Sequence, residues 1–555
     1  MKKIIKTLGL SSVLSISACS VLETANQASE ESFYGTLSPM ASNAVYFLMT
    51  DRFVNGDPTN DYIDQGGEFP TYRNELKGPD GKSAFVGYMG GDFKGILDNA
   101  DYIADMGFGA IWLTPIVDQP DQAFSGGEKI EFGGAFKDGG KTGYHGYWGS
   151  NFFKVDEHLP SEDLTFADLT EKLREEHNLK TVLDIVLNHG SPAFTMPKQQ
   201  PKFGQVFDED DELIADHQNL SPEQLDKSNP LHAFFNTKKD IMQLSDFDEN
   251  SPAMDYLTEA YLHWIDQGAD AFRIDTIKHM PHTAWKTFTD NIREDHPDFF
   301  MFAESYSFDA NFIAEHTKPE NGGVSVLDFP GREAMLKVFE NANSDFELLN
   351  SYLYLEDSPY QNSYELMTFY DNHDMSRMDA SEAGFIDAHN WLFTSRGIPV
   401  VYYGSEVGFM AGTSEHQGNR NYFGQGNVYK AVTHPIFENL KRVANIRKKL
   451  VALQKGLQVN VKLKGNEATF YRVYEHEGVY QTALILLNKS GKDAEMKVDK
   501  WLSSGEWSEQ ISGEKLRVNT TDTLKTVVPA HGLKIYVLNE KNNNEALALL
   551  LSSRM

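Results

Sequence analysis

Apolar segments of strand length recur along most of the chain, and helix-length segments separate each from the next. Their β-branched and aromatic residues favour buried strands over short buried helices. The segments are 44–49, 109–116, 181–187, 271–277, 299–304, 324–329, 365–370 and 398–404. Strands that alternate with helices in this way predict an α/β fold, a (β/α)8 TIM barrel over 42–189 and 244–450.

Two connections are too long for ordinary loops between a strand and its helix. The first, 118–141, is rich in glycine and predicts a mobile wall over one face of the barrel. The second, 190–243, follows the third strand and predicts an inserted domain. Short strands joined by turns then predict an antiparallel β-sandwich over 451–539. The tail, 540–555, is too short to span a membrane, and we expect a frayed helix there.

The N-terminus has the order of a secretory signal, in which lysines precede an apolar run and small residues follow it. The small residues end at Cys19, and this ending resembles a bacterial lipobox. We therefore predict a signal peptide at 1–18, a lipidated Cys19 and a flexible tether at 19–41. Lipidation would anchor the protein to a membrane, at the outer membrane or cell surface or in the periplasm. The alternative is an ordinary cleaved signal and a secreted protein.

The charge balance limits the possible partners. The chain has 50 Lys and Arg against 81 Asp and Glu, a net charge of −31 at pH 7, which argues against nucleic acid. An acidic surface suits a neutral polysaccharide or calcium, although simple solubility explains it equally well. Cys19 is the only cysteine, so the exported protein has no disulfide. The composition is that of a soluble globular protein, and we expect a monomer.

Three predicted strands end in a carboxylate. Asp275, Glu304 and Asp374 stand where the apolar pattern stops in AFRIDTIKH, FFMFAES and MTFYDNHD. The C-terminal ends of barrel strands converge on one face, so these side chains are expected to meet there. Two such carboxylates can hydrolyse a glycosidic bond, one by attacking the sugar carbon and one by protonating the leaving oxygen. A single carboxylate after a strand is usually a cap, but three in this order predict a glycosidase.

The neighbours of two of these carboxylates support different roles. Arg273 lies two residues before Asp275, and strand residues with this spacing point to the same side. Its fixed positive charge favours the ionised form of Asp275, as a nucleophile requires. Glu304 lies in an apolar strand, where burial raises the pKa and keeps the proton that a leaving oxygen needs.

Four segments in order resemble the signature regions of the α-amylase family of glycoside hydrolases. They are DIVLNH (184–189), AFRIDTIKH (271–279), FAES (302–305) and FYDNHD (369–374). The likeness extends from about Ala44 to about Tyr429. Further segments resemble the cyclodextrin-forming and maltogenic branch of that family. They are GYHGYW (143–148), TIKHMP (276–281) and SRGIPVVYYGSE (395–406).

The resemblance implies a role for each site residue and identifies the inserted domain as domain B. Asp275 matches the nucleophile, Glu304 the acid and base, and Asp374 a third carboxylate that binds sugar hydroxyls. The implied substrate contacts are Tyr144 as a stacking face, Trp148 as its support, His145, His189 and His373 around the cleaved sugar, Arg273, Lys278 and His279 on the acceptor side, and Arg420 on the donor side. In cyclodextrin-forming relatives this arginine has an acidic neighbour. That neighbour is missing in this chain, where His416 and Gln417 stand instead.

The resemblance also implies structural Ca²⁺ at one or two sites, since hard cations prefer carboxylate, amide and carbonyl oxygens. The ligands of the first are Asn55, Asp57, Asn60, Asp61, Gly90 and Asp92. The ligands of the second are Asn188, Asp216, Asp248 and the carbonyl of His279. Without the resemblance, the first stretch is an Asx-rich turn followed by a glycine turn.

Three functions remain open. The first is a retaining hydrolase of α-1,4-glucosidic bonds in starch and maltooligosaccharides, and the second is a glucan transglycosylase that forms cyclodextrins. The third, an inactive glycan-binding surface protein, needs a missing carboxylate, and none is missing. Two departures favour hydrolysis. The acidic segment 204–220 lacks the central aromatic around which cyclising relatives wrap the glucan, and those relatives continue into two further β-domains.

Overall fold

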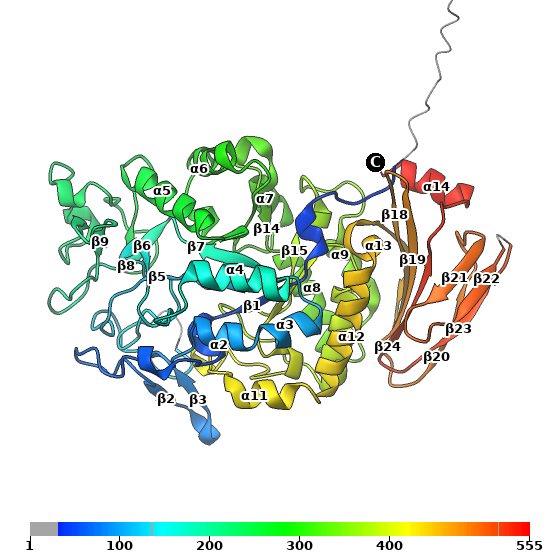
Figure 1. Ribbon diagram of the computed structural model, residues 1–555, viewed down its shortest axis with the longest axis horizontal. Coiled ribbons are helices and arrows are strands. Elements are labelled where there is room, and N and C mark those ends of the chain that lie inside the picture. The colour runs from blue at the N-terminus through cyan, green and yellow to red at the C-terminus, as the bar shows by residue number, and fades with distance from the viewer. Residues whose placement is uncertain (1–31, 135–136, 520, 555) are drawn as a thin grey trace, which may run out of the picture.

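The computed structural model describes residues 32–134, 137–519 and 521–554. Eight parallel strands form one sheet in the middle of the molecule (Figure 1). In sheet order they are β14 (Ser325–Val326), β13 (Phe300–Ala303), β12 (Ala271–Ile274), β7 (Lys180–Ile185), β4 (Ala110–Leu113), β1 (Val45–Leu48), β16 (Ile398–Tyr402) and β15 (Met367–Thr368). A parallel bridge between Leu327 and Met367 joins the two ends of this sheet. The predicted TIM barrel is therefore confirmed.

The barrel strands are apolar along their whole length because both of their faces are covered. Every residue of β1, β4, β12 and β16 is buried. Inside the barrel, the ring of Phe47 stacks on that of Trp112 with 3.9 Å between centroids. Burial on both faces explains why these strands show continuous apolar runs instead of alternation.

Helices connect the strands and surround the barrel (Figure 1). The longer ones begin with recognisable caps, such as the reciprocal capping box of Thr165 and Asp168 at the start of α4. The helices up to the C-terminal domain are α1 (Thr50–Phe53), α2 (Phe93–Asp98), α3 (Ala100–Met106), α4 (Phe166–His177), α5 (Ala253–Asp266), α6 (His282–Asp295), α7 (Ala310–Ala314), α8 (Phe329–Phe339), α9 (Asn350–Leu353), α10 (Glu382–Leu392), α11 (Gly424–Ala431), α12 (Pro435–Lys449) and α13 (Val451–Lys455).

A smaller sheet lies beside the barrel and includes strands of the inserted segment. Its order is β10 (Leu213–Asp216), β9 (Gln205–Phe207), β6 (Asn151–Val155) and β5 (Val117–Asp118). The other two strands, β5 and β6, lie on either side of the long connection 118–141. The pair β8 (His189–Pro192) and β11 (Leu244–Asp246) brings the ends of the inserted segment together. A separate hairpin is formed by β2 (Glu75–Lys77) and β3 (Ser83–Phe85).

The C-terminal part is antiparallel and has its own core. Its main sheet has the order β17 (Leu457–Lys464), β18 (Glu467–His476), β19 (Val479–Asn488), β24 (Gly532–Leu538), β21 (Gly505–Glu509) and β22 (Lys515–Val518). A second pair consists of β20 (Ala494–Val498) and β23 (Leu524–Val528). Tyr471, Leu484 and Trp507 are fully buried in the core of this part. The antiparallel architecture agrees with the prediction from sequence.

The tail is better ordered than expected. Residues Glu545–Ser552 form α14, which packs on the C-terminal sheet (Figure 1). Leu547 and Leu551 are completely buried in the same core as the sheet, while Leu549 is 77% exposed. Arg554 donates a hydrogen bond of 2.6 Å from Nη1 to the carbonyl of Gln458. The expected helix is therefore present, but it is not frayed, because one face of the segment is anchored.

The N-terminal region is already packed on the folded part at Phe33, within the predicted tether 19–41. Phe33 is buried and forms a β-bridge with Glu475, and the Gly35 N–H donates to the carbonyl of Lys455 at 2.7 Å. A flexible tether that ends at Ala41 is therefore too long. The predicted signal peptide and Cys19 lie outside the described residues. Among the residues that the structure describes, no helix is both long and apolar enough to cross a membrane.

Candidate active site

A cavity of about 470 Å³ opens at the C-terminal ends of the barrel strands. It contains all three predicted carboxylates and most of the predicted sugar contacts. Its lining includes Asp138, Lys141, His145, Tyr147, Trp148, His189, Ile241, Met242, Leu244, Asp275, Thr276, Lys278, His279, Glu304, Tyr306, His373, Asp374, Glu415 and Arg420. Strands and loops that are far apart in sequence therefore bring these groups together, as the barrel geometry predicts.

Arg273 binds two carboxylates through one nitrogen. Its Nη1 lies 2.8 Å from Oδ1 of Asp184 and 2.7 Å from Oδ1 of Asp275. Arg273 on β12 is in register with Asp184 on β7, and its side chain is almost completely buried. Asp184 also accepts hydrogen bonds from Trp112 and from the Tyr147 hydroxyl, at 3.0 and 2.8 Å. Asp184 thus orients the arginine that lies beside Asp275.

Glu304 follows β13 directly and faces the same guanidinium. Its Oε2 lies 3.5 Å from Nη2 of Arg273 and accepts a hydrogen bond of 3.1 Å from the Thr276 N–H. Thr276 has a left-handed φ of 50°, a strained conformation for a β-branched residue at the end of a strand. Burial raises the pKa of Glu304 well above its usual range, in the direction that the apolar strand predicted. A carboxyl group with a raised pKa can carry a proton at neutral pH.

Asp374 lies in the loop after β15 between a histidine and an arginine. His373 Nε2 is 3.3 Å from Asp374 Oδ2, and Arg420 Nη2 is 2.8 Å from Oδ1. Arg420 also donates from Nε to the carbonyl of His373 at 2.9 Å, which fixes both residues of this loop. The side chain of Asp374 remains 32% exposed towards the cavity.

The three predicted histidines are buried at the cavity and keep an unused ring nitrogen. Burial lowers the pKa of His145, His189 and His373, so their neutral forms are favoured. His145 Nε2, His189 Nδ1 and His373 Nδ1 have no hydrogen-bond partner among the described residues. A neutral imidazole with a free nitrogen can donate to or accept from a sugar hydroxyl.

Tyr147 is the aromatic residue beside these histidines, and it was not among the predicted substrate contacts. Its ring stacks on His373 with 5.3 Å between centroids and 6° between planes. Tyr144 does not line the cavity, because the Arg52 guanidinium covers its ring at 3.6 Å. The predicted stacking role of Tyr144 therefore does not fit. Gly146 makes the turn of this segment, since a Cβ there would meet the Pro115 carbonyl at 2.1 Å.

Lys278 and His279 lie at the cavity on the Glu304 side, as the resemblance implied. Lys278 donates to the carbonyl of Tyr306 at 2.9 Å and also lies over the Tyr306 ring. His279 Nδ1 lies 3.1 Å from Oδ2 of Asp240. Trp148 lines the cavity from the other side and packs with Phe124 in a small separate core.

Arg420 does have an acidic neighbour, contrary to the expectation from sequence. Glu415 Oε1 lies 2.7 Å from Nη1 of Arg420 and 3.1 Å from Lys141 Nζ. The expectation compared only the positions of His416 and Gln417, and the acid stands one residue before them. Spacing alone did not reveal Glu415, because its partner Lys141 belongs to a loop 274 residues away in sequence.

The predicted first calcium site is assembled in space. Asn55 donates from Nδ2 to Asp61 Oδ1 at 2.7 Å, and a Cβ on Gly90 would meet that same oxygen at 2.2 Å. Asn60 is buried, and its Oδ1 has no hydrogen-bond partner among the described residues. A buried acceptor without a donor beside a carboxylate fits a hard cation.

Two predicted ligands of this first site are already engaged as caps. Asp92 caps α2 and accepts from the N–H groups of Gly95 and Asp57, at 2.6 and 2.7 Å. Asp57 accepts from the Thr59 N–H at 3.0 Å. The predicted ligands without a capping role are therefore Asn55, Asn60, Asp61 and the Gly90 backbone.

The second predicted calcium site needs correction in two ligands. Asp216 accepts hydrogen bonds from Gln199, Gln205 and the Gln218 N–H. Asp248 lies 2.8 Å from Lys227 Nζ and accepts from the Asn250 N–H at 3.0 Å. Both carboxylates therefore bind partners other than Asn188. The position of Asp216 and Asp248 in the sequence did not indicate where their side chains lie.

Two other carboxylates, Asp240 and Asp246, lie beside Asn188, His279 and His189. Asp240 lies 3.4 Å from Asn188 Nδ2 and contacts His279. Asp246 pairs with His189 across β8 and β11, and burial together with the charge of Asp240 raises the pKa of Asp246 to about 7. Two neighbouring carboxylates beside an amide fit a cation with oxygen ligands.

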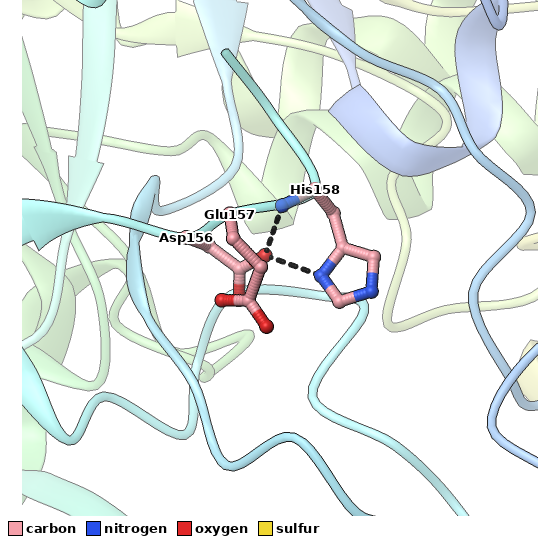
Figure 2. A group of neighbouring side chains, drawn as sticks. All are labelled: Asp156, Glu157 and His158. Atoms are coloured by element: carbon pink, nitrogen blue, oxygen red, sulfur yellow. Dashed lines mark hydrogen bonds and ion pairs between the residues drawn. The ribbon is translucent and has the colours of Figure 1, made fainter. Parts of the chain in front are cut away.

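A further cluster of possible ligands follows β6. Figure 2 shows Asp156, Glu157 and His158 side by side, with His158 Nδ1 2.8 Å from Asp156 Oδ1. The His158 ring stacks on Tyr88 at 3.7 Å, and Tyr88 donates to Asp156 Oδ2 at 3.3 Å. These contacts use the histidine nitrogen that faces the acids, so the cluster joins the end of β6 to the segment of Tyr88. Three consecutive residues do not have the spacing of a metal-ligand motif, so the sequence alone did not indicate this cluster.

Comparisons with known proteins agree with this architecture. The cyclomaltodextrin glucanotransferase of Thermoanaerobacterium thermosulfurigenes is 28% identical over 481 residues, which cover 82% of this chain and 60% of that protein. That of Paenibacillus macerans is 30% identical over 397 residues, which cover 68% of this chain and 50% of that protein. The chain thus spans 50–60% of the length of these two curated relatives.

Two solved structures have the same fold over most of the chain. An alpha-amylase from Anoxybacillus superposes with a TM-score of 0.67 at 26% identity and covers 90% of this chain and 99% of its own. A cyclomaltodextrin glucanotransferase described as having a three-domain ABC distribution gives a TM-score of 0.70 at 26% identity, with the same coverage. The family model described as the catalytic domain of alpha amylase matches residues 47–431, and this confirms the resemblance of the four segments. The chain belongs to the alpha-amylase family.

Proposed function

We propose that the protein is a retaining glycoside hydrolase that cleaves α-1,4-glucosidic bonds in starch and maltooligosaccharides. The observation that carries this proposal is the arrangement around Arg273. One guanidinium contacts both Asp275 and Glu304, at 2.7 and 3.5 Å, inside a cavity that also contains Asp374. A retaining mechanism needs two carboxyl groups close together, one ionised and one protonated.

In the proposed reaction, Asp275 attacks the anomeric carbon and Glu304 gives its proton to the leaving oxygen. Arg273 holds Asp275 in position through the ion pair of 2.7 Å, while burial keeps the proton on Glu304. After the leaving group departs, the ionised Glu304 takes a proton from water, and the oxygen of that water attacks the anomeric carbon. The bond to Asp275 then breaks, and the product keeps its original anomeric configuration.

The remaining polar groups would hold the sugar on which this chemistry occurs. Asp374 accepts from sugar hydroxyls beside His373, and the rings of His145 and His189, which line the cavity, bond others. Tyr147 keeps His373 in place by stacking. These contacts orient the sugar relative to Asp275, which lowers the entropic part of the barrier.

We also propose that Ca²⁺ supports the fold at the two clusters described above. Asn55, Asn60, Asp61 and the Gly90 backbone would hold one ion, and Asn188, Asp240, Asp246 and the His279 carbonyl would hold the other. The bound ion would neutralise buried carboxylates and fix the loops that carry His189 and His279, and it would take no part in bond cleavage.

Transglycosylation is the second candidate, and the relatives that are cyclomaltodextrin glucanotransferases favour it. The segment 204–220, expected to face the substrate, contributes no residue to the cavity lining, which instead receives Ile241 and Met242 from the inserted segment and Leu244 from β11. These side chains are aliphatic and do not provide a central aromatic. The number of domains no longer argues against cyclisation, since one such enzyme has three. The aliphatic side chains keep hydrolysis as the main proposal.

The product profile on soluble starch separates the candidates. We expect linear maltooligosaccharides and no cyclodextrins, and NMR of early products should show the α-anomer. Cyclodextrins as the main products would favour transglycosylation. An absence of any cleavage would favour the inactive glycan-binding protein.

For the location, we propose export and attachment to a membrane through lipidated Cys19. The support comes from the sequence, in which basic, apolar and small residues precede the only cysteine. The chain becomes packed at Phe33, which leaves a spacer of about a dozen residues between Cys19 and the folded part.

A further inference from the structure

We propose that the enzyme acts from the non-reducing ends of glucan chains, because a wall of cross-linked charged residues closes the donor side of its cavity. This donor wall consists of Asp138, Lys141, Glu415, His416 and Arg420. The inference rests on the proposed function. It adds that the substrate is the non-reducing end of a glucan, of which only a short segment fits on the donor side.

The positions of the reacting groups define the two sides of the cavity. Glu304 protonates the leaving oxygen, so the departing part of the glucan lies on its side, with Lys278 and Tyr306. The sugar that stays on Asp275 lies towards Asp374, and the rest of the donor chain must continue beyond it. Arg420 contacts Asp374 at 2.8 Å, and the donor wall begins at this arginine.

The donor wall is built from two loops that meet across the cavity. Glu415 accepts from Arg420 of its own loop at 2.7 Å and from Lys141 of the other loop at 3.1 Å. Lys141 also lies 3.5 Å from Asp138. Beside these ion pairs, the Gly133 N–H donates to the His416 carbonyl at 2.8 Å, and the His416 ring contacts the Gly134 carbonyl.

The donor wall is also supported from behind. Gln243 of the inserted segment donates to Asp138 Oδ2 at 2.7 Å, so a third segment holds it. The ammonium of Lys141 lies 5.6 Å from the Trp148 ring, and Trp148 packs into the small core with Phe124 and Phe203. A buried and paired charge network is costly to break, because each lost partner leaves an unpaired charge. The wall should therefore stay closed when substrate binds.

On the opposite side, the cavity is lined by a more exposed aromatic residue, Tyr306. Tyr306, Phe308 and Phe312 follow Glu304 and are 43%, 44% and 47% exposed, whereas Lys141 and Arg420 are only 7% and 6% exposed. Exposed aromatic rings on one side offer surface to a long leaving chain. The asymmetry gives the donor chain little room and the leaving chain an open path.

The test compares two maltoheptaosides of equal length, one free and one carrying an ethylidene block at its non-reducing end. Hydrolysis is followed by chromatography of the products. For the wild-type enzyme, we expect kcat/KM on the free substrate to exceed that on the blocked one by about tenfold or more. Equal values would overturn the inference and leave the proposed function intact. Cleavage of neither would overturn both.

Variants test whether the donor wall causes the preference. Lys141→Ala removes the cross-loop ion pair, and Lys137→Ala is the matched control, because the ion pairs of Lys137 among the described residues are with Glu128 and Glu131 of its own loop. We expect Lys141→Ala to lower the ratio of free to blocked hydrolysis by about fivefold or more, Lys141→Arg to restore it and Lys137→Ala to leave it unchanged. An unchanged ratio in a folded Lys141→Ala enzyme would contradict the inference.

A second measurement on the wild-type enzyme does not depend on variants. An enzyme that acts from chain ends releases reducing sugar from starch long before the iodine colour is lost. We expect this slow loss of colour for each bond cleaved. A rapid loss of colour, as in internal cleavage, would overturn the inference.

Discussion

Arg273 Nη1 lies 2.7 Å from Oδ1 of Asp275, and only Ile274, the last residue of β12, separates the two in sequence. The same nitrogen lies 2.8 Å from Asp184, so the arginine is fixed before any substrate arrives. A preformed ion pair of this kind holds the carboxylate in place without a rearrangement during the reaction. Asp275 is therefore suited to attack and Glu304, on the other arm of the guanidinium, to donate a proton.

Neutral replacements should separate the two roles. Asp275→Asn and Glu304→Gln keep the shape of each side chain, so we expect normal melting curves but losses of several orders of magnitude in starch hydrolysis. On α-maltosyl fluoride, whose leaving group needs no proton, Glu304→Gln should retain its first turnover and Asp275→Asn should not. Either variant keeping about a tenth of wild-type starch activity would contradict the assignment.

The pH dependence follows from the burial of Glu304. Burial disfavours its charged form and raises its pKa from 4.5 to about 8. The proton needed by the leaving oxygen is then present through neutral pH and is lost as the pH rises through about 8. We expect kcat/KM on maltooligosaccharides to fall above that pH, and the fall should be absent with α-maltosyl fluoride. An alkaline limb near pH 5 on maltooligosaccharides would contradict this prediction.

The sequence predicted the barrel and its carboxylates well because both depend on local patterns. The apolar strands needed no knowledge of distant contacts, and the residue after each strand is placed by the barrel itself. Tyr147, Asp184 and Glu415 were missed because their partners come from other strands and loops. Asp240 and Asp246 were missed for the same reason, since only the pairing of β8 with β11 places them near Asn188 and His279.

Calcium should stabilise the folded protein. Ligand binding to the native state alone raises its stability by mass action, so excess chelator should lower the melting temperature and added Ca²⁺ should restore it. Asp240→Asn should weaken the calcium-dependent rise in melting temperature. Asp248→Asn is the matched control, since Asp248 pairs with Lys227. An unchanged melting curve in excess chelator would remove both proposed sites.

Lipidation predicts a particular mature N-terminus. Mass spectrometry of the native protein should find a chain that begins at acylated Cys19, in the membrane fraction and released by detergent. Cys19→Ala should prevent lipidation and free the exported protein from the acyl anchor, without affecting the barrel. An unmodified N-terminus beyond Cys19 would refute the anchor.

The docking of α14 predicts a stability difference between two leucines of one helix. Leu551 is completely buried against the C-terminal sheet, whereas Leu549 is 77% exposed on the opposite face. Truncating a buried leucine loses transfer free energy and leaves a cavity, so Leu551→Ala should cost about 2–5 kcal/mol in urea unfolding of the C-terminal part. Leu549→Ala should change the unfolding free energy by less than about 0.5 kcal/mol. Equal effects of the two substitutions would show that the helix does not pack on the sheet in solution.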